Sequence, residues 1–380
     1  MSIDPALTQQ LTDWRRHLHA HPELSRAEAE TAAFVCARLA DWGIPFQSGI
    51  GGHGIVATLS RGSSNRGVGL RGDMDALPID EQTGLAHASL RPGVMHACGH
   101  DGHTTSLLGA ARLLQQDTAW SGTIHLVFQP AEEGAGGAQA MLDDGLLQRF
   151  PMERIFAYHN WPELAAGHIA VRSGPVMASA SRVAFTMLGT AGHAGLPHLT
   201  HDPVLASAHA LIALQSVVSR EISPTDSAVL SFCVMEAGAA TNQIPDRATF
   251  RGTYRAHRPE VRDAMAAAIT RIVRGTAATF GMRASVEIAH TTPPVVNPAS
   301  EAEIVARTAQ GLGFPVHQDL PPSLVAEDFG AYQQHIPGAF LWVGNGESAG
   351  LHSPDYDFND VILPVAAQTL AAIAKKALAE

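Results

Sequence analysis

The segment from His96 to His103 holds one thiol, three imidazoles and one carboxylate, with Gly99 and Gly102 between them. Thiolates and imidazoles are the side chains that bind borderline-soft divalent metals most readily. The two glycines permit sharp backbone turns, so side chains that are neighbours in sequence can converge on one point. A helical pattern follows over 104–114. This Cys- and His-rich turn is therefore the first candidate for the chemistry of the chain.

The length and the charge of the chain limit what it can be. With 380 residues it exceeds the size at which one hydrophobic core usually stops growing, so two domains are expected. Hydrophobic residues make up 46% and charged residues 16%, which is typical of a globular protein. The net charge of −11 argues against a nucleic-acid partner, because such a partner requires a basic surface.

The cysteines and the N-terminus bear on localisation. Cys36, Cys98 and Cys233 are too few and too far apart for a disulfide framework, which suits a reducing compartment. The first ten residues show neither a basic segment nor the apolar segment of a signal peptide. No apolar stretch is expected to reach the length that spans a bilayer. These observations predict a cytoplasmic protein without a membrane partner.

The first half of the chain alternates helical and strand patterns. Apolar residues have helical spacing over 7–20 and 27–42, and strand patterns occupy 54–59, 67–71, 122–128 and 154–158. This alternation predicts an α/β fold whose central mixed sheet is flanked by helices. The stretch Gly49–Gly54 fits G-x-G-x-x-G, but it follows a helix and precedes a strand. We interpret it as a helix-to-strand loop, because a dinucleotide site requires the opposite order.

A second pattern begins near residue 181. Its predicted order is a strand over 181–189, a helix over 202–218, strands over 228–235 and 248–256, a helix over 260–280 and a strand over 284–288. This β-α-β-β-α-β order is ferredoxin-like. The remainder returns to α/β alternation. We therefore predict a discontinuous catalytic domain, 1–180 and 293–380, with a small α+β domain inserted over 181–292.

Polar motifs follow several predicted strands, where α/β proteins build their sites. They occupy 71–78, 129–134, 158–162 and 350–355. In the second of them, Glu132 and Glu133 are adjacent carboxylates that point in different directions. One can bind a metal while the other moves a proton of metal-bound water. The alternative is a solvated helix N-terminus, where glutamates are favoured by the helix dipole.

Each candidate ligand also has an ordinary structural interpretation. Cys98 alone is more often a small buried hydrophobe. His100 and His103 can hydrogen bond locally, His159 can be a satisfied core histidine, and His352 can be a residue of a surface loop. Together, however, these metal-type side chains all lie beside predicted strand ends, and we therefore expect a metal site.

Six strings of the sequence carry a family resemblance. They are Met95–Asp101, Gln129–Glu133, Gly192–Ala194, Thr241–Asp246, Ala326–Phe329 and Leu351–Pro354. In this order they resemble the aminoacylase/hippurate hydrolase amidohydrolases, a branch of the co-catalytic metallopeptidases that includes plant auxin-conjugate hydrolases. The match runs over nearly the whole chain, and its Cys-Gly-His-Asp and Glu-Glu strings are the most specific.

The resemblance implies a set of metal ligands and a general base. The implied ligands of two divalent metals are Cys98, His100, Glu133, His159 and His352. Glu132 matches the general base. Asp75 matches an acidic residue that contacts the ligand residues and not the metals. Asp73 stands where the wider superfamily has a metal-binding histidine, a departure that is normal for this branch. Asp101 and His103 are expected to support ligands or to cap the following helix.

The resemblance also implies substrate-binding residues in the inserted domain. This domain resembles the lid of the family, which commonly forms a dimer interface. His193 matches a histidine that stabilises the reacting carbonyl oxygen, within its own subunit or across a dimer. Asn242 and Arg255 match residues that hold the free carboxylate of the substrate, which suits the bidentate donors of arginine. The alternatives are a turn asparagine and an arginine on the surface of a sheet.

The resemblance further implies hydrolysis of the amide bond of an N-acyl amino acid, with release of a carboxylic acid and a free amino acid. The expected metals are Mn²⁺ or Zn²⁺, with Co²⁺ or Ni²⁺ as alternatives. Other interpretations remain open. They are a dipeptidase or carboxypeptidase of the same superfamily, a thiol hydrolase with Cys98 as nucleophile, and a non-catalytic metal-binding protein on this fold.

Overall fold

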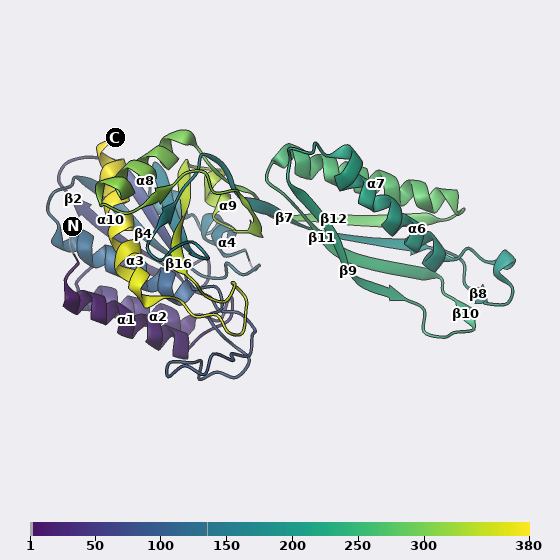
Figure 1. Ribbon diagram of the computed structural model, residues 1–380, viewed down its shortest axis with the longest axis horizontal. Helices are drawn as coiled ribbons and strands as arrows, with labels where there is room; N and C mark the ends of the chain where they lie inside the picture. The colour runs from purple at the N-terminus through teal and green to yellow at the C-terminus, as the bar shows by residue number, and fades with distance from the viewer. Residues whose placement is uncertain (1–2, 135) are drawn as a thin grey trace. The chain divides into compact units, whose positions relative to one another are not determined.

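The computed structural model describes residues 3–134 and 136–380 and divides the chain into two compact units (Figure 1). The first unit comprises the chain up to Gly174, Val296–Pro321 and Asp328–Glu380, and the second comprises Pro175–Val295 and Pro322–Glu327. The sequence places the first boundary at 180/181. It lies earlier in the structure because strand β7, Gly174–Leu188, runs without a break across that point.

The first unit contains an eight-stranded mixed sheet and its helices. Its strands are β1 (Phe46–Ile50), β2 (Gly54–Arg61), β3 (Gly67–Asp73), β4 (Gly122–Gln129), β5 (Arg154–Pro162), β6 (Ile169–Ala170), β14 (Val316–His317) and β16 (Gly338–Gly346). Its helices are α1 (Pro5–Ala20), α2 (Ala29–Asp41), α3 (His100–Gln116), α4 (Gly137–Asp143), α5 (Leu146–Arg149), α8 (Ala299–Gly311), α9 (Gly330–Gln333), the 3₁₀ turn η3 (Asp360–Ile362) and α10 (Leu363–Ala379).

The strand order of this sheet is β1-β2-β4-β3-β5-β16-β6-β14. The four neighbouring strands β4, β3, β5 and β16 are parallel to one another. Their carboxyl ends therefore lie at one edge of the sheet, where α/β folds place their sites. Every residue of β3 is buried, as is typical of a parallel strand covered on both faces. The predicted α/β fold with a central mixed sheet is confirmed.

The two glycines of the Cys/His segment have different roles. Gly99 has a φ of +90° and makes the turn before α3, as expected. Gly102 lies inside α3, and a Cβ placed there would meet the ring of Phe358 at 2.2 Å. The second glycine therefore allows close packing rather than a turn.

Two sequence interpretations are wrong in the first unit. The stretch Gly49–Gly54 is the turn of a hairpin between β1 and β2, because the short edge strand β1 lacked a clear sequence pattern. In addition, Asp360–Ala379 is long and apolar enough to cross a membrane by length and composition. In this structure 61% of its apolar window is buried, and α10 packs against α3 and α8. Its apolar character is therefore that of a core helix.

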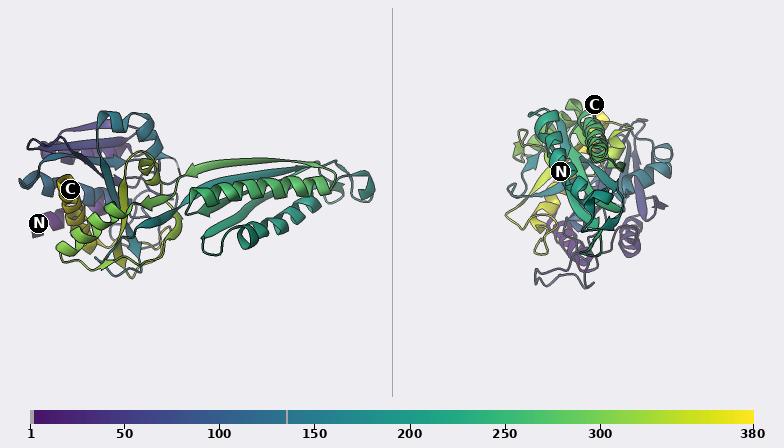
Figure 2. Two further views of the ribbon diagram at one scale, coloured as in Figure 1. Left: turned by 90° about the horizontal axis from the view of Figure 1, so that it is seen from above. Right: turned by 90° about the vertical axis from the view of Figure 1, so that its right-hand side faces the viewer.

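The second unit contains a six-stranded sheet, in which four long antiparallel strands are joined by the short strands β13 and β15, and two long helices (Figure 2). Its elements are β7, β8 (Gly192–His193), η1 (Pro197–Leu199), α6 (Pro203–Ser216), η2 (Val217–Glu221), β9 (Ala228–Ala237), β10 (Gln243–Ile244), β11 (Arg247–Ala256), α7 (Pro259–Thr279), β12 (Arg283–Thr292), β13 (Val295–Asn297) and β15 (Ser323–Ala326). The strand order β12-β7-β11-β9 is the ferredoxin-like order that the sequence predicts. Helices α6 and α7 pack on each other and on β11.

Candidate metal centre

Most of the predicted ligands converge at the carboxyl edge of the parallel strands. Cys98 and His100 lie at the start of α3, Glu133 follows β4, His159 lies in the last half of β5, and His352 follows β16. The sheet order places β4 and β5 on either side of β3, with β16 next to β5. Strands that are far apart in sequence thus bring five metal-type side chains to one edge.

The first group of ligand atoms belongs to Cys98, His100 and His159. All three residues are buried, and their ligand atoms lie within 4.8 Å of one another. Cys98 Sγ is 3.3 Å from His159 Nε2. A thiolate with two imidazoles is a donor set that suits Zn²⁺ and related divalent metals.

The second group shares Cys98 with the first. The ligand atoms of Cys98, Glu133 and His352 also lie within 4.8 Å of one another, and His352 Nε2 is 3.2 Å from Glu133 Oε1. His352 adopts a φ of +64°, and its backbone N–H donates to the carbonyl of Ala97 at 2.8 Å. This bond ties the His352 loop to the residue before Cys98. Cys98 therefore belongs to both groups of ligand atoms.

The hydrogen bonds of the histidines direct their free nitrogens to the centre. His100 Nδ1 donates to the carbonyl of Asp75 at 2.8 Å, and His159 Nδ1 donates to the carbonyl of Asn160 at 2.6 Å. Each ring therefore keeps the lone pair of Nε2, which is how metal-binding histidines are usually oriented. His100 Nε2 is buried without a hydrogen-bond partner among the described residues. Because an unpaired buried polar atom is costly, this nitrogen fits a bound cation.

The electrostatics of the centre agree with this fit. Burial, together with the carboxylate of Glu133, raises the pKa of the Cys98 thiol well above its usual range. Burial alone lowers the pKa of His100, but Asp73 and other carboxylates outweigh it and raise that pKa to about 10. Burial lowers the pKa of His159 well below its usual value. A bound cation would displace the protons from the thiol and from His100.

The carboxylate of Asp75 organises the turn that carries the two glutamates. Its Oδ1 accepts from Glu132 N and its Oδ2 accepts from Glu133 N, both at 3.0 Å. Ser25 Oγ donates to the same carboxylate at 2.6 Å. Glu132 Oε1 accepts from Asp328 N at 3.3 Å, and a ligand atom of Glu132 lies within 4.8 Å of those of His100 and Glu133. The sequence did not single out Ser25.

His103 and Asp101, two other polar residues of the Cys/His segment, bond away from the two groups. His103 Nδ1 is 2.6 Å from Asp73 Oδ1, and a salt bridge of 2.6 Å joins Asp73 to Arg71. Asp101 Oδ2 lies 2.8 Å from His19 Nδ1. Asp73, His100 and His103 also hold ligand atoms within 4.8 Å of one another, but the hydrogen bond between Asp73 and His103 already occupies both of these side chains. Arg71 opens the polar motif over 71–78, whereas the buried partner His19 carried no recognisable motif in the sequence.

His193 lies in the second unit, at the end of the sheet where β8 pairs with β10. It is exposed, and the backbone N–H of Gly195 donates to its Nδ1 at 3.0 Å. Because Nδ1 accepts, the neutral ring carries its proton on Nε2, which can donate to a carbonyl oxygen. The carbonyl of Asn242 accepts from Ala194 N at 3.0 Å, so Asn242 lies beside the His193 loop.

Arg255 lies at the opposite end of β11 from Asn242. Leu188, the last residue of β7, pairs with Arg247, whereas Arg255 pairs with Ala180. The eight residue steps between Arg247 and Arg255 span roughly 26 Å along the strand. Asn242 and Arg255 of one chain are therefore far apart along the sheet, and their joint binding of a carboxylate stays a prediction. The sequence motifs carry no information on this separation along the strand.

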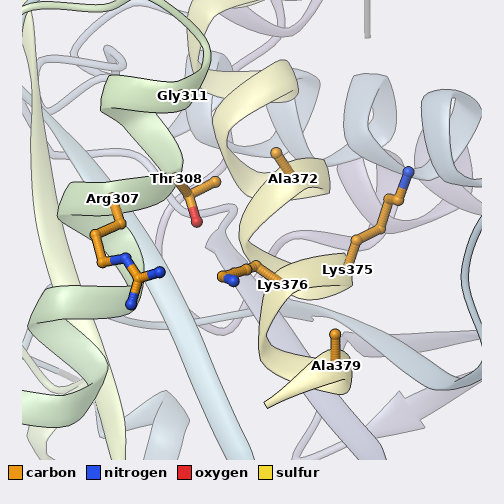
Figure 3. Close-up of a pocket in the computed structure, with 7 residues that line it drawn as sticks. All are labelled: Arg307, Thr308, Gly311, Ala372, Lys375, Lys376 and Ala379. Carbon is orange, nitrogen blue, oxygen red and sulfur yellow. The ribbon is translucent and has the colours of Figure 1, made fainter.

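A separate hollow of about 460 Å³ lies between α8 and α10 (Figure 3). Its lining includes Arg307, Thr308, Lys375 and Lys376, and none of the predicted site residues. Lys375 pairs with Asp117, and Lys376 pairs with Glu380 at 2.8 Å. These lysine charges are already compensated, so the candidate site is the metal centre and not this hollow.

Comparison with known proteins supports the motif resemblance. A sequence model described as peptidase family M20/M25/M40 matches residues 69–376. N-acetylcysteine deacetylase of Bacillus subtilis (strain 168) is 39% identical over 378 residues, covering 98% of this chain and 97% of that protein. Hippurate hydrolase of Campylobacter jejuni is 37% identical over 366 residues, covering 96% and 95%. A solved structure from Bacillus subtilis, described as a dinuclear metal binding peptidase from the M20 family, has a TM-score of 0.89 at 35% identity and covers 99% of both chains.

Proposed function

The chain belongs to peptidase family M20/M25/M40 and is a hydrolase, and we propose that it cleaves the amide bond of N-acyl amino acids to release a carboxylic acid and a free amino acid. The observation that carries this proposal is the pair of ligand groups that share Cys98. Relatives named for deacetylation of N-acetylcysteine and for hydrolysis of hippurate support the substrate class.

We propose that the five converging side chains would hold two divalent metals. One ligand group joins Cys98 to His100 and His159 and the other joins Cys98 to Glu133 and His352, so each group would hold one metal. The thiolate favours Zn²⁺, whereas the carboxylate and imidazole ligands also accept Mn²⁺, Co²⁺ or Ni²⁺. A reducing, cytoplasmic location remains a prediction that suits a free thiol in this role.

The proposed mechanism relies on the different surroundings of two adjacent glutamates. When bound, the metals lower the pKa of a water molecule and polarise the substrate carbonyl. Glu132 accepts a proton from that water and returns it to the leaving nitrogen. Asp328 N holds one oxygen of Glu132, and Asp75 holds the backbone from which Glu132 projects. His193 stays the predicted donor to the carbonyl oxygen.

The alternative of a thiol hydrolase fits the centre poorly. A nucleophilic cysteine needs a lowered pKa, which an electropositive, partly exposed environment provides. Cys98 is 7% exposed, and burial with surrounding carboxylates raises its pKa instead. A dipeptidase or a non-catalytic metal protein on this fold would keep the same ligands, so activity has to distinguish them.

The test is release of free amino acid from a panel of N-acetyl, N-benzoyl and indole-acetyl amino acids and dipeptides. Apo-protein would be reconstituted separately with Mn²⁺, Zn²⁺ and Co²⁺. We expect N-acyl amino acids to be cleaved, and the apo-protein to be inactive. Preference for dipeptides would favour the peptidase alternative. Tight metal binding without release from any substrate would overturn the proposed activity.

We also propose that the second unit forms a homodimer through β9 and α6. Among the described residues β9 is an edge strand of its sheet, so one side of its backbone can pair with another chain. Large apolar side chains are exposed on both elements, with Met235 of β9 at 67% and Ile212 of α6 at 73%. Such a surface is suited to self-association by a two-fold axis.

Two-fold pairing of β9 also accounts for the separation of Asn242 and Arg255. Residue 228 of β9 pairs with 256 of β11, and residue 237 pairs with 248. Two β9 strands related by a two-fold axis run antiparallel, so the start of one lies beside the end of the other. The Arg255 end of one sheet then neighbours the Asn242 end of its partner. Substrate-binding residues from two chains can thus meet only in a dimer.

Replacing Ile212 with Arg and Met235 with Glu is expected to convert the dimer into a monomer. Light scattering with size-exclusion chromatography measures the mass, and Leu90→Arg in the first unit, where Leu90 is 70% exposed, is the matched control. The monomer is expected to lose most turnover but to keep its metals. A double variant that stays dimeric would contradict the assigned surface.

A further inference from the structure

A second buried carboxylate, that of Glu28, holds the turn before Glu132. Glu28 directly precedes α2 and is fully buried. Its Oε1 accepts a hydrogen bond from Ala131 N at 2.8 Å and another from Arg26 N at 3.0 Å. Its Oε2 is buried without a hydrogen-bond partner among the described residues. The side chain therefore reaches a distant turn instead of capping its own helix.

Ala131 needs this support because its backbone is strained. It has a φ of +56°, in the left-handed region that residues with a Cβ rarely adopt. Its carbonyl accepts from Gly137 N at 2.9 Å. A Cβ at Gly137 would lie 1.6 Å from the carbonyl oxygen of Pro130, so only glycine allows this approach. Strained backbone of this kind persists only where its surroundings enforce it.

Two carboxylates thus bind three consecutive backbone N–H groups. Glu28 accepts from Ala131, and Asp75 accepts from Glu132 and Glu133. The three bonds fix the backbone on the N-terminal side of both glutamates. A change in the φ of Ala131 would rotate the chain that follows and so redirect both side chains.

We propose that Glu28 is a positioning residue, which holds Ala131 in the left-handed conformation and thereby directs Glu132 and Glu133 to their separate partners. This inference rests on the proposed function, because it takes Glu132 as the base and Glu133 as a metal ligand. Holding Ala131 requires an acceptor oxygen at Glu28 and not a negative charge. An amide in its place would accept the same hydrogen bond.

The test compares Glu28→Ala with Glu28→Gln. Glu28→Ala is expected to lower kcat roughly 100-fold, because small displacements of catalytic groups have effects of this size. It is also expected to reduce bound metal from two ions towards one per chain, measured by mass spectrometry of the eluted metal. Glu28→Gln is expected to keep most of the kcat and most of the bound metal, since the amide oxygen can accept the hydrogen bond from Ala131 N.

A second substitution separates positioning from stability. Glycine adopts positive φ without strain, so Ala131→Gly in the Glu28→Ala background should recover part of the lost kcat and metal. The melting temperature of each variant is measured in parallel. Recovery of the melting temperature without recovery of kcat would show a merely structural role and overturn the proposal. A Glu28→Ala variant with the kcat and the metal content of the wild-type protein would also overturn the proposal.

The metal readout keeps this test distinct from that of the proposed function. If the wild-type protein cleaves no N-acyl amino acid, the proposed function fails. The loss of metal in Glu28→Ala and its return with Ala131→Gly still decide whether Glu28 positions the turn. Unchanged metal content in Glu28→Ala would then refute the positioning role by itself.

Discussion

Replacing Glu132 with Gln is expected to lower kcat roughly 1,000-fold while the protein keeps both metals. The amide retains the size of the side chain and an oxygen that can accept from Asp328 N. It cannot take a proton from water, and general acid–base catalysis by one side chain commonly contributes 10²- to 10⁴-fold in rate. Because Glu132 is not proposed as a ligand, metal affinity should change little.

Steady-state kinetics on the best N-acyl amino acid and metal analysis of the same preparation measure this prediction. Glu303→Gln on α8, which changes an exposed glutamate, is the matched control and should behave as wild type. The pH dependence of kcat/KM is a second measurement. The variant should lack the part of this dependence that follows ionisation of the general base. Normal turnover by Glu132→Gln would remove the assigned base. Loss of metal together with activity would instead assign Glu132 as a ligand.

Replacing Cys98 is expected to have the second large effect, because Cys98 is shared by both ligand groups. Cys98→Ala should lose both metals and all measurable turnover. Cys98→Asp should recover part of the metal and of the activity, because a carboxylate is also a ligand for divalent metals. A mechanism with a nucleophilic thiol cannot survive that change.

Metal content and turnover of the two variants are compared with those of Cys36→Ser, which changes a half-buried cysteine of α2 outside both ligand groups and should have no effect. A chelator applied to the wild-type protein gives an independent reading, since a thiol hydrolase would remain active without metal. If Cys98→Ala keeps two metals, the shared-ligand arrangement is wrong. If the chelated protein remains active, the metal mechanism is wrong.

Much of the fold was predictable because its patterns are local. The strands over 67–71 and 122–128 and the helix over 104–114, which the structure extends to His100–Gln116, follow from the spacing of apolar residues. The ferredoxin-like order of the second unit follows from alternation and helix length. The short edge strand β1 and the two-residue strands β8 and β10 were not predictable, since pairing with distant partners defines them.

The candidate site was predictable in its chemistry more than in its arrangement. The residue types of the Cys/His segment and of Glu132–Glu133 indicated metals and a base before any coordinates. Of this segment the resemblance implied only Cys98 and His100 as ligands, and in the structure these two belong to the ligand groups. His103 was expected to support a ligand or to cap the helix, and its bond to Asp73 of β3 is known only from the structure, because it joins residues 30 positions apart.

The sequence by itself therefore determined the elements, the chemical types of the ligands and the family, because these depend on local pattern and residue identity. Only the tertiary structure decided that Cys98 is shared, that Glu28 holds Ala131, and that Asn242 and Arg255 lie at opposite ends of β11. Each of these depends on which strand neighbours which in the sheet. That order is set by packing of the whole core, and no short stretch of sequence contains it.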